Sequence, residues 1–131
     1  MLGATHMLAG AAFYRQMENR VLAYGLAFGS HFLLDAVPHY ELSYNWNRIL
    51  VVGAGLFLVV LARQDWRILL AAFLALLPDL IWEYGLSGSF AQIHNSLHTP
   101  WNGPFYLFFF ESLLLALFLG LILAPRREKL N

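Results

Sequence analysis

Histidines and carboxylates recur at four-residue intervals in three separate segments of the chain. The pairs are His31 with Asp35, Asp79 with Glu83, and His94 with His98. Residues i and i+4 lie on one face of an α-helix, about one turn apart, so each pair can hold one cation. Two histidines at this spacing bind zinc in the zinc proteases. Three such pairs therefore predict a shared metal site.

The ligand types restrict which metal this site would take. Imidazoles and carboxylates without a thiolate favour zinc, iron, manganese or nickel over copper(I), and the chain has no cysteine. The candidate ligands, with His6 among them, outnumber the three or four that one zinc ion needs. We therefore expect a divalent transition metal, zinc above all, with two or more ions. Two such ions ~3.5–4 Å apart would form a hydrolytic arrangement around a shared water.

Four further polar residues are candidates for catalytic, substrate-binding or structural roles. Glu83 is the candidate general acid or base, because a carboxylate beside bound water can transfer protons. Arg48 and His39 are candidate substrate-binding residues, although Arg48 could equally be an anchor at the membrane interface and His39 a hydrogen-bonding partner of a neighbouring helix. Glu111 has no partner four residues away, so it either stabilises helix packing or orients a metal ligand.

The composition points to a membrane protein. Of 131 residues, 60% are hydrophobic and only 12% are charged, against about 25% charged in an ordinary soluble domain. This excludes a disordered chain and disfavours a soluble enzyme, and the absent cysteines exclude a disulfide scaffold. Eight basic and eight acidic residues cancel, so no nucleic-acid partner is predicted. We expect one integral membrane domain over residues 1–131, with a basic tail at 125–131.

Five apolar segments are candidate membrane helices. They cover residues 1–14, 21–38, 49–62, 68–84 and 105–124. A span needs about 20 apolar residues, which the last segment satisfies best and the first least. A cleaved signal peptide is a competing reading of residues 1–14, disfavoured because no basic region precedes the apolar run. The expected fold is all-α: a bundle of about five membrane-embedded helices with a short helix in the 85–104 connection.

The basic residues orient this bundle. If the five spans alternate, seven of the eight basic residues share one side of the membrane, and that side is expected to be cytoplasmic. The seven are Arg15, Arg20, Arg63, Arg67, Arg126, Arg127 and Lys129. The N-terminus, all five histidines and the intramembrane carboxylates then lie toward the extracytoplasmic side of a prokaryotic cytoplasmic membrane, with the C-terminus in the cytoplasm.

Several motifs resemble those of the YdjM-type family of LexA-regulated, membrane-bound metal-dependent hydrolases. They are the early Thr5-His6, the stretch S-H-F-L-L-D-A-V-P-H from Ser30 to His39, the L-P-D ending at Asp79, and H-x-x-x-H-x-P from His94 to Pro100. That family is distantly similar to zinc-dependent phospholipase C and P1 nuclease, which are all-helical and cut phosphoesters. The resemblance implies as metal ligands His6, His31, Asp35, Asp79, His94 and His98. The chain departs from the family after Pro78, where a D-x-D pattern is usual but Leu80 and Ile81 follow Asp79, and at Asn95, where an arginine is usual.

These observations lead to one expected function and one alternative. The expectation is a membrane-embedded, metal-dependent phosphoesterase that acts on a lipid or lipid-linked substrate at the extracytoplasmic face, with Asp79 and Glu83 as its catalytic carboxylates. Membrane lipids are its expected partners. The alternative is a non-catalytic protein that binds or transports metal ions or protons. Residues 51–62 and 112–124 carry no charge, which argues against a polar path through the bundle.

Overall fold

All the regular secondary structure in the described part of the chain is α-helical. A computed structural model describes residues 1–40, 42–63, 65–97 and 105–125. The helices are α1 (Gly3–Gln16), α2 (Arg20–Asp35), α3 (Tyr44–Leu61), α4 (Arg67–Glu83), α5 (Gly88–Leu97) and α6 (Tyr106–Leu123). The expected all-α architecture is confirmed, including a short helix, α5, in the 85–104 connection.

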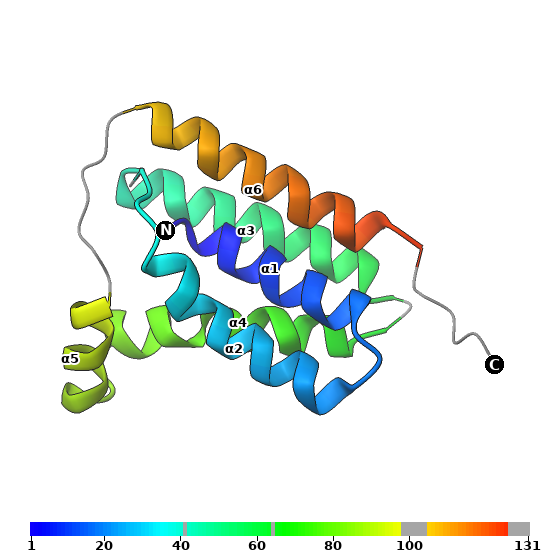
Figure 1. The fold of residues 1–131 in the computed structure, drawn as a ribbon, viewed down its shortest axis with the longest axis horizontal. Helices are drawn as coiled ribbons and strands as arrows, with labels where there is room; N and C mark the ends of the chain where they lie inside the picture. The colour runs from blue at the N-terminus through cyan, green and yellow to red at the C-terminus, as the bar shows by residue number, and fades with distance from the viewer. Residues whose placement is uncertain (41, 64, 98–104, 126–131) are drawn as a thin grey trace.

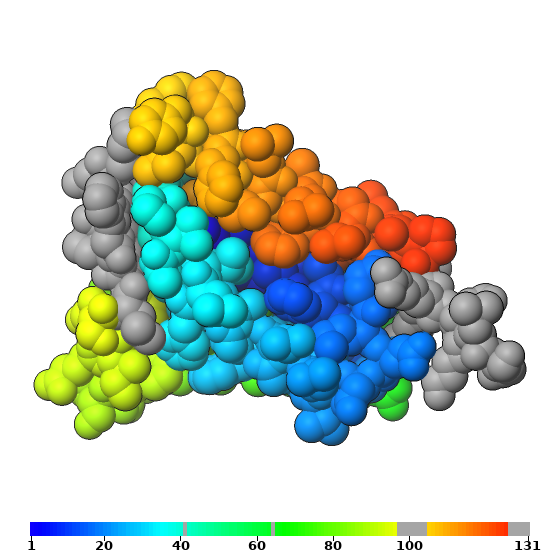
Figure 2. Space-filling model, viewed as in Figure 1, coloured from blue at the N-terminus to red at the C-terminus, as the bar shows by residue number. Residues whose placement is uncertain are grey.

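Helix α1 is the central element of the bundle. It packs against α2, α3, α4 and α6, whereas α6 packs only against α1 within the described residues. On the face shown in Figure 2, α6 and α2 cover most of α1. Ten of its 14 residues are buried, so α1 meets protein on nearly every side.

Small residues allow this enclosure. A Cβ atom added at Gly10 would lie 2.5 Å from the Ala71 carbonyl oxygen and 2.7 Å from the Ala75 Cβ atom. Contacts this short are not tolerated, so the backbones of α1 and α4 approach to a distance that only glycine permits. Small residues serve the same purpose at helix interfaces in membranes generally.

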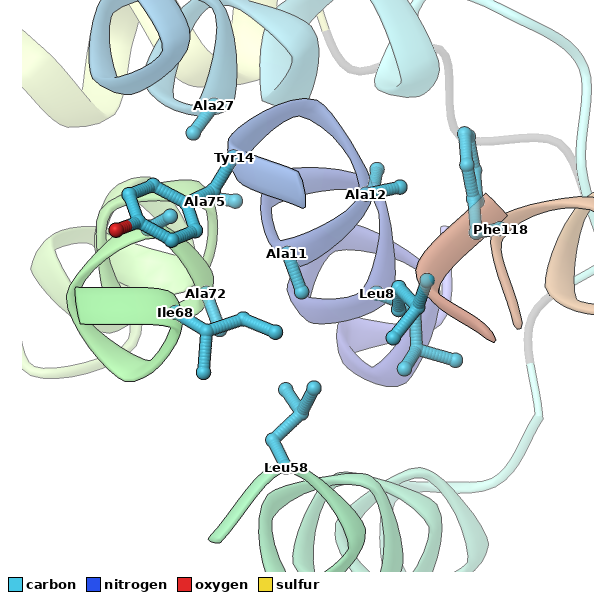
Figure 3. Close-up of a cluster of buried hydrophobic side chains, with 13 residues drawn as sticks. Leu8, Ala11, Ala12, Tyr14, Ala27, Leu58, Ile68, Ala72, Ala75 and Phe118 are labelled. Atoms are coloured by element: carbon cyan, nitrogen blue, oxygen red, sulfur yellow. The ribbon is translucent and has the colours of Figure 1, made fainter. Parts of the chain in front are cut away.

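The apolar core fills the half of the bundle away from the start of α1. Figure 3 shows side chains of four helices around α1: Leu58 and Ile68 point toward each other below it, whereas Tyr14 and Phe118 lie on its two opposite sides. Tyr14, Leu58 and Ile68 are no more than 2% exposed. The Tyr14 hydroxyl donates a 2.6 Å hydrogen bond to Asp65 in the α3–α4 connection, which satisfies its one polar group at the edge of this core.

The helices run alternately along the bundle, as Figure 1 shows for α1, α2, α3, α4 and α6. One end, the basic end, therefore holds Arg15, Arg20, Arg63 and Arg67. The opposite end, the histidine end, holds the start of α1, the close of α2 and the α4–α5 pair. The alternation on which the predicted charge separation depends is thus present among these helices.

Fewer helices than the five predicted have the length and hydropathy of a membrane span. Within the described residues, two helices of 18 residues each, α3 and α6, are long and apolar enough to cross a membrane; the bent pair α4–α5 adds a third span if it counts as one. Helices α1, α2 and α4 have 14, 16 and 17 residues. For α1, the physical reason is its enclosure, because a helix surrounded by protein need not match the thickness of the lipid.

The elbow between α4 and α5 turns the chain sharply at the histidine end. The two helices are bent by 109° from one another. Gly85 lies at the elbow with a φ of 61°, a left-handed conformation that glycine adopts without strain. Pro78 stands inside α4, which continues through it to Glu83. The elbow folds α5 back so that it contacts α2 as well as α4.

Candidate metal centre

Four side chains from three helices converge at the histidine end. His31 and Asp35 come from α2, Asp79 from α4 and His94 from α5, and their ligand atoms all lie within 4.8 Å of one another. His31 Nε2 is 3.1 Å from Asp35 Oδ2, 3.1 Å from His94 Nε2 and 3.6 Å from Asp79 Oδ1. His94 Nε2 is 3.4 Å from each of the two carboxylates. No other group of three or more such ligands occurs within the described residues.

The spacing of these atoms suits a small tetrahedral ion. The five distances range from 3.1 to 3.6 Å and average about 3.3 Å. These five separations are close to the ~3.3 Å expected between ligand atoms around a tetrahedral ion with bonds of ~2.0 Å, and the sixth, between the two carboxylate oxygens, is within 4.8 Å. The donor set of two imidazoles and two carboxylates also fits zinc, iron or manganese.

Neighbouring groups hold the ligands in place. The Ala75 carbonyl of α4 lies 3.0 Å from His31 Nδ1. With the proton on Nδ1, the Nε2 lone pair faces the other ligands, the arrangement common in metal-binding histidines. The indole of Trp82 stacks on the His94 ring with centroids 5.5 Å apart. Both contacts restrict the imidazoles to rotamers that point into the group.

The group is open on one side. The side chains of His31, Asp35 and His94 are at most 3% exposed, whereas that of Asp79 is 26% exposed. Burial lowers the pKa of His94, but its hydrogen bonds to Asp35 and Asp79 outweigh burial and raise the pKa to about 9. Without a metal, His94 is therefore a cation at neutral pH between two carboxylates. A divalent ion would take over this charge.

His6 is brought to the centre but lies behind it. Its Nε2 is 3.1 Å from Asp35 Oδ1, the carboxylate oxygen opposite the one among the ligand atoms. Its ring lies against that of His31, with centroids 4.1 Å apart. His98, the remaining predicted ligand, lies outside the described residues. The described structure therefore assembles four of the six predicted ligands.

His39 and Glu111 are fully buried at the histidine end and are not members of the group. His39 Nδ1 is 2.8 Å from the Val37 carbonyl, and its Nε2 contacts the Met1 amino group. Glu111 Oε1 accepts a 2.6 Å hydrogen bond from the Leu2 N–H and one of 3.1 Å from the Thr5 hydroxyl. Of the two roles expected for Glu111, these bonds correspond to helix packing, because they attach α6 to the first turn of α1.

Glu83 and Arg48 form a separate cluster near the surface. Arg48 Nη2 lies 3.0 Å from Glu83 Oε1, and the Tyr44 hydroxyl donates a 2.7 Å hydrogen bond to the same oxygen. The guanidinium of Arg48 lies over the Tyr44 ring. The carboxylate predicted to act as acid or base thus joins α3 to α4, one turn beyond Asp79, rather than entering the ligand group.

Two contributors were missed by the sequence analysis. Trp82, which stacks on His94, stands three residues after Asp79, so its helical spacing was a usable signal. The Ala75 carbonyl, which orients His31, had no side-chain signal at all. Backbone acceptors of this kind can be identified only once the packing of α2 on α4 is known.

Comparisons of the chain with models of known protein families, with curated proteins and with solved structures found no match. The geometry of the site therefore carries the functional assignment.

Proposed function

We propose that this chain is a membrane-embedded, metal-dependent hydrolase that cleaves a phosphoester of a lipid or lipid-linked substrate. The observation that carries the proposal is the four-ligand group with one partly exposed member, Asp79. Buried ligands hold an ion firmly, and the exposed edge lets a water and a substrate approach it. The described residues assemble one such group, so we propose one bound ion, zinc by preference. The number of candidate ligands in the sequence had predicted two or more ions.

The ion would be held by His31, Asp35, Asp79 and His94. When bound, a divalent metal lowers the pKa of a coordinated water and neutralises charge on phosphoryl oxygens. In the hydrolysis, water forms the new P–O bond and the ester P–O bond breaks. The proton lost by the water must reach the departing alcohol, so a carboxylate near the open edge is needed.

Glu83 is the proposed proton carrier. It follows Asp79 by four residues on the same helix face, about 6 Å further along the axis. Its Oε1 is occupied by Tyr44 and Arg48, which leaves Oε2 for the substrate. Arg48, with 56% of its side chain exposed, can bind an anionic headgroup with its remaining N–H donors. His39, the other candidate substrate-binding residue, is fully buried, so a substrate cannot reach it and it is left out of the proposal.

The lipid substrate is proposed from the setting of the site. Two helices are long and apolar enough to cross a membrane, and the group lies at the end opposite the basic end. The charge rule assigns this histidine end to the extracytoplasmic side. A site there would meet headgroups, with the C-terminus in the cytoplasm. The YdjM-type resemblance implies the same class of enzyme, and membership of that family is part of the proposal.

The first experiment is elemental analysis of protein purified without chelator. We expect about one equivalent of a transition metal, and fewer than about 0.3 equivalents after attempted repletion would refute the metal centre. A panel of phospholipid, lipid diphosphate, nucleotide and peptide substrates follows. Turnover of a phosphoester that is lost in Asp79→Ala supports the hydrolase, whereas a metal-loaded protein inactive on the whole panel refutes it.

One observation favours a second candidate, a protein that binds a metal without catalysis. Four protein ligands fill a tetrahedral shell, as in structural zinc sites, whereas catalytic zinc keeps a position for water. Hydrolysis requires a water ligand on the ion, so either Asp79 must leave its position or the ion must bind a fifth ligand. Detection of a water ligand on the metal-loaded protein would therefore favour the hydrolase. Transport through the bundle is disfavoured, because the apolar core in Figure 3 lies between the site and the basic end.

A further inference from the structure

The two carboxylate oxygens of Asp35 have different partners. Oδ2 faces the ligand group, 3.1 Å from His31 Nε2 and 3.4 Å from His94 Nε2. Oδ1 faces away from it, 3.1 Å from His6 Nε2 and 3.3 Å from the Met1 amino nitrogen. The carboxylate is thus held from behind by α1, so its rotamer does not depend on a metal alone.

His6 has the contacts of a supporting residue rather than a ligand. Its side chain is fully buried, and its one hydrogen bond within the described residues is to Asp35. The other ring nitrogen, Nδ1, is buried without a hydrogen-bond partner in that part of the chain. Neither nitrogen belongs to the set of atoms lying mutually within 4.8 Å. The ring packs on His31, and its Nε2 can donate to Asp35.

Helix α6 fixes the part of α1 that carries His6. Glu111 is the only charged residue of α6, and it accepts hydrogen bonds from the Leu2 N–H and the Thr5 hydroxyl. The first N–H groups of a helix lack intrahelical partners, so a buried acceptor there sets where the helix begins. Thr5 directly precedes His6. A line of contacts therefore runs from α6 through α1 to Asp35.

We propose that His6 is a positioning residue that orients Asp35 for the metal, and that Glu111 positions His6 by holding the start of α1. The inference depends on the metal centre under the proposed function, but not on hydrolysis. It replaces the expectation that His6 is a ligand. It also explains why α6 carries one charged residue, Glu111, among residues that are otherwise uncharged.

The test compares His6→Ala with His6→Gln, because a glutamine amide can still donate to Asp35. Zinc affinity is measured by competition with a chromophoric chelator, and ligands are counted by X-ray absorption of the zinc-loaded proteins. We expect two imidazoles in the wild type and in His6→Ala, with one ion at saturation in both. Removing a group that orients a ligand costs about 10–100-fold in affinity, so His6→Ala should bind that much more weakly and His6→Gln should recover most of the loss.

Three results would overturn the positioning role: one imidazole fewer around zinc in His6→Ala than in the wild type, loss of the ion from His6→Ala at saturation, or no recovery in His6→Gln. A wild type that binds no metal overturns both this inference and the proposed function. A wild type that binds metal but cleaves nothing overturns the hydrolase only, because the affinity and ligand measurements are independent of turnover.

The contribution of α6 is tested by Glu111→Leu and Glu111→Gln. Glutamine keeps an acceptor for Leu2 and Thr5, whereas leucine leaves both donors unsatisfied, so affinity should fall in Glu111→Leu and be largely retained in Glu111→Gln. Gln16→Leu is the matched control, because the Gln16 amide joins α1 to α6 at the basic end by donating to the Leu121 carbonyl. An equal effect of Gln16→Leu and Glu111→Leu would overturn the role of Glu111.

Discussion

Removal of His31 should weaken metal binding by two to three orders of magnitude. His31 Nε2 lies within 3.6 Å of a ligand atom of each of the other three residues, so it contributes fully to the group. Zinc bound by four protein ligands is worth about 10–16 kcal/mol, or about 2.5–4 kcal/mol for each ligand. At about 1.4 kcal/mol per factor of ten, His31→Ala should raise the zinc Kd by about 10²–10³-fold.

Zinc competition at fixed pH measures this change, with circular dichroism to confirm that the helices are retained. His39→Gln is the control, since His39 is also a buried histidine of the histidine end but is not a member of the group. It should shift the Kd by less than tenfold. If His31→Ala bound zinc like the wild type, or if both variants lost affinity equally, the assignment of the four ligands would be wrong.

Three further predictions concern protons, packing and the surface cluster. The apparent zinc affinity should fall about tenfold for each pH unit below 9, because the metal must displace the proton that His94 holds with a pKa of about 9; proton release measured on zinc addition at pH 7 checks this. Gly10→Ala should destabilise the bundle by about 1–3 kcal/mol, because its Cβ would lie 2.5 Å from a backbone oxygen. Gly29→Ala, which meets nothing within 4 Å, should instead gain about 0.5–1 kcal/mol; reversible unfolding in detergent measures both, and equal effects would contradict the close packing of α1 on α4. Arg48→Gln should cost at most about 1 kcal/mol of stability because its pair with Glu83 is partly exposed, yet it should raise KM for an anionic lipid substrate; an unchanged KM would leave Arg48 only its role at the interface.

The sequence predicted the parts of the centre that lie within one helix. His31 and Asp35 share a face of α2 and both enter the group, as their four-residue spacing indicated. The same spacing puts Glu83 on the helix face of Asp79, but its side chain is not a member of the ligand group. It lies at an exposed helix end and pairs with Arg48 of another helix instead. Spacing identifies a face, but partners from another helix depend on packing that a single segment does not encode.

The expected number of spans exceeds the number of helices that are long and apolar enough, for a related reason. Hydropathy reports that a segment avoids water, but not whether lipid or protein surrounds it. Residues 1–14 looked too short to span, and the structure uses this short segment as the enclosed α1. The glycines and alanines of that segment indicate close packing, but the sequence alone could not say on which neighbours.

The attachment of α1 to α6 has a consequence for synthesis of the chain. Leu2 and Thr5 are 109 and 106 residues away from Glu111, their shared acceptor. Helix α1 therefore acquires its buried acceptor only after α6 has been made, and until then its polar first turn must stay hydrated or bind a temporary partner. Contacts so distant in sequence form late, because the whole chain must close around them. The arrival of α6 thus completes both the bundle and the support behind Asp35, so a chain truncated before α6 would lack a properly held metal ligand even with all four ligand residues present.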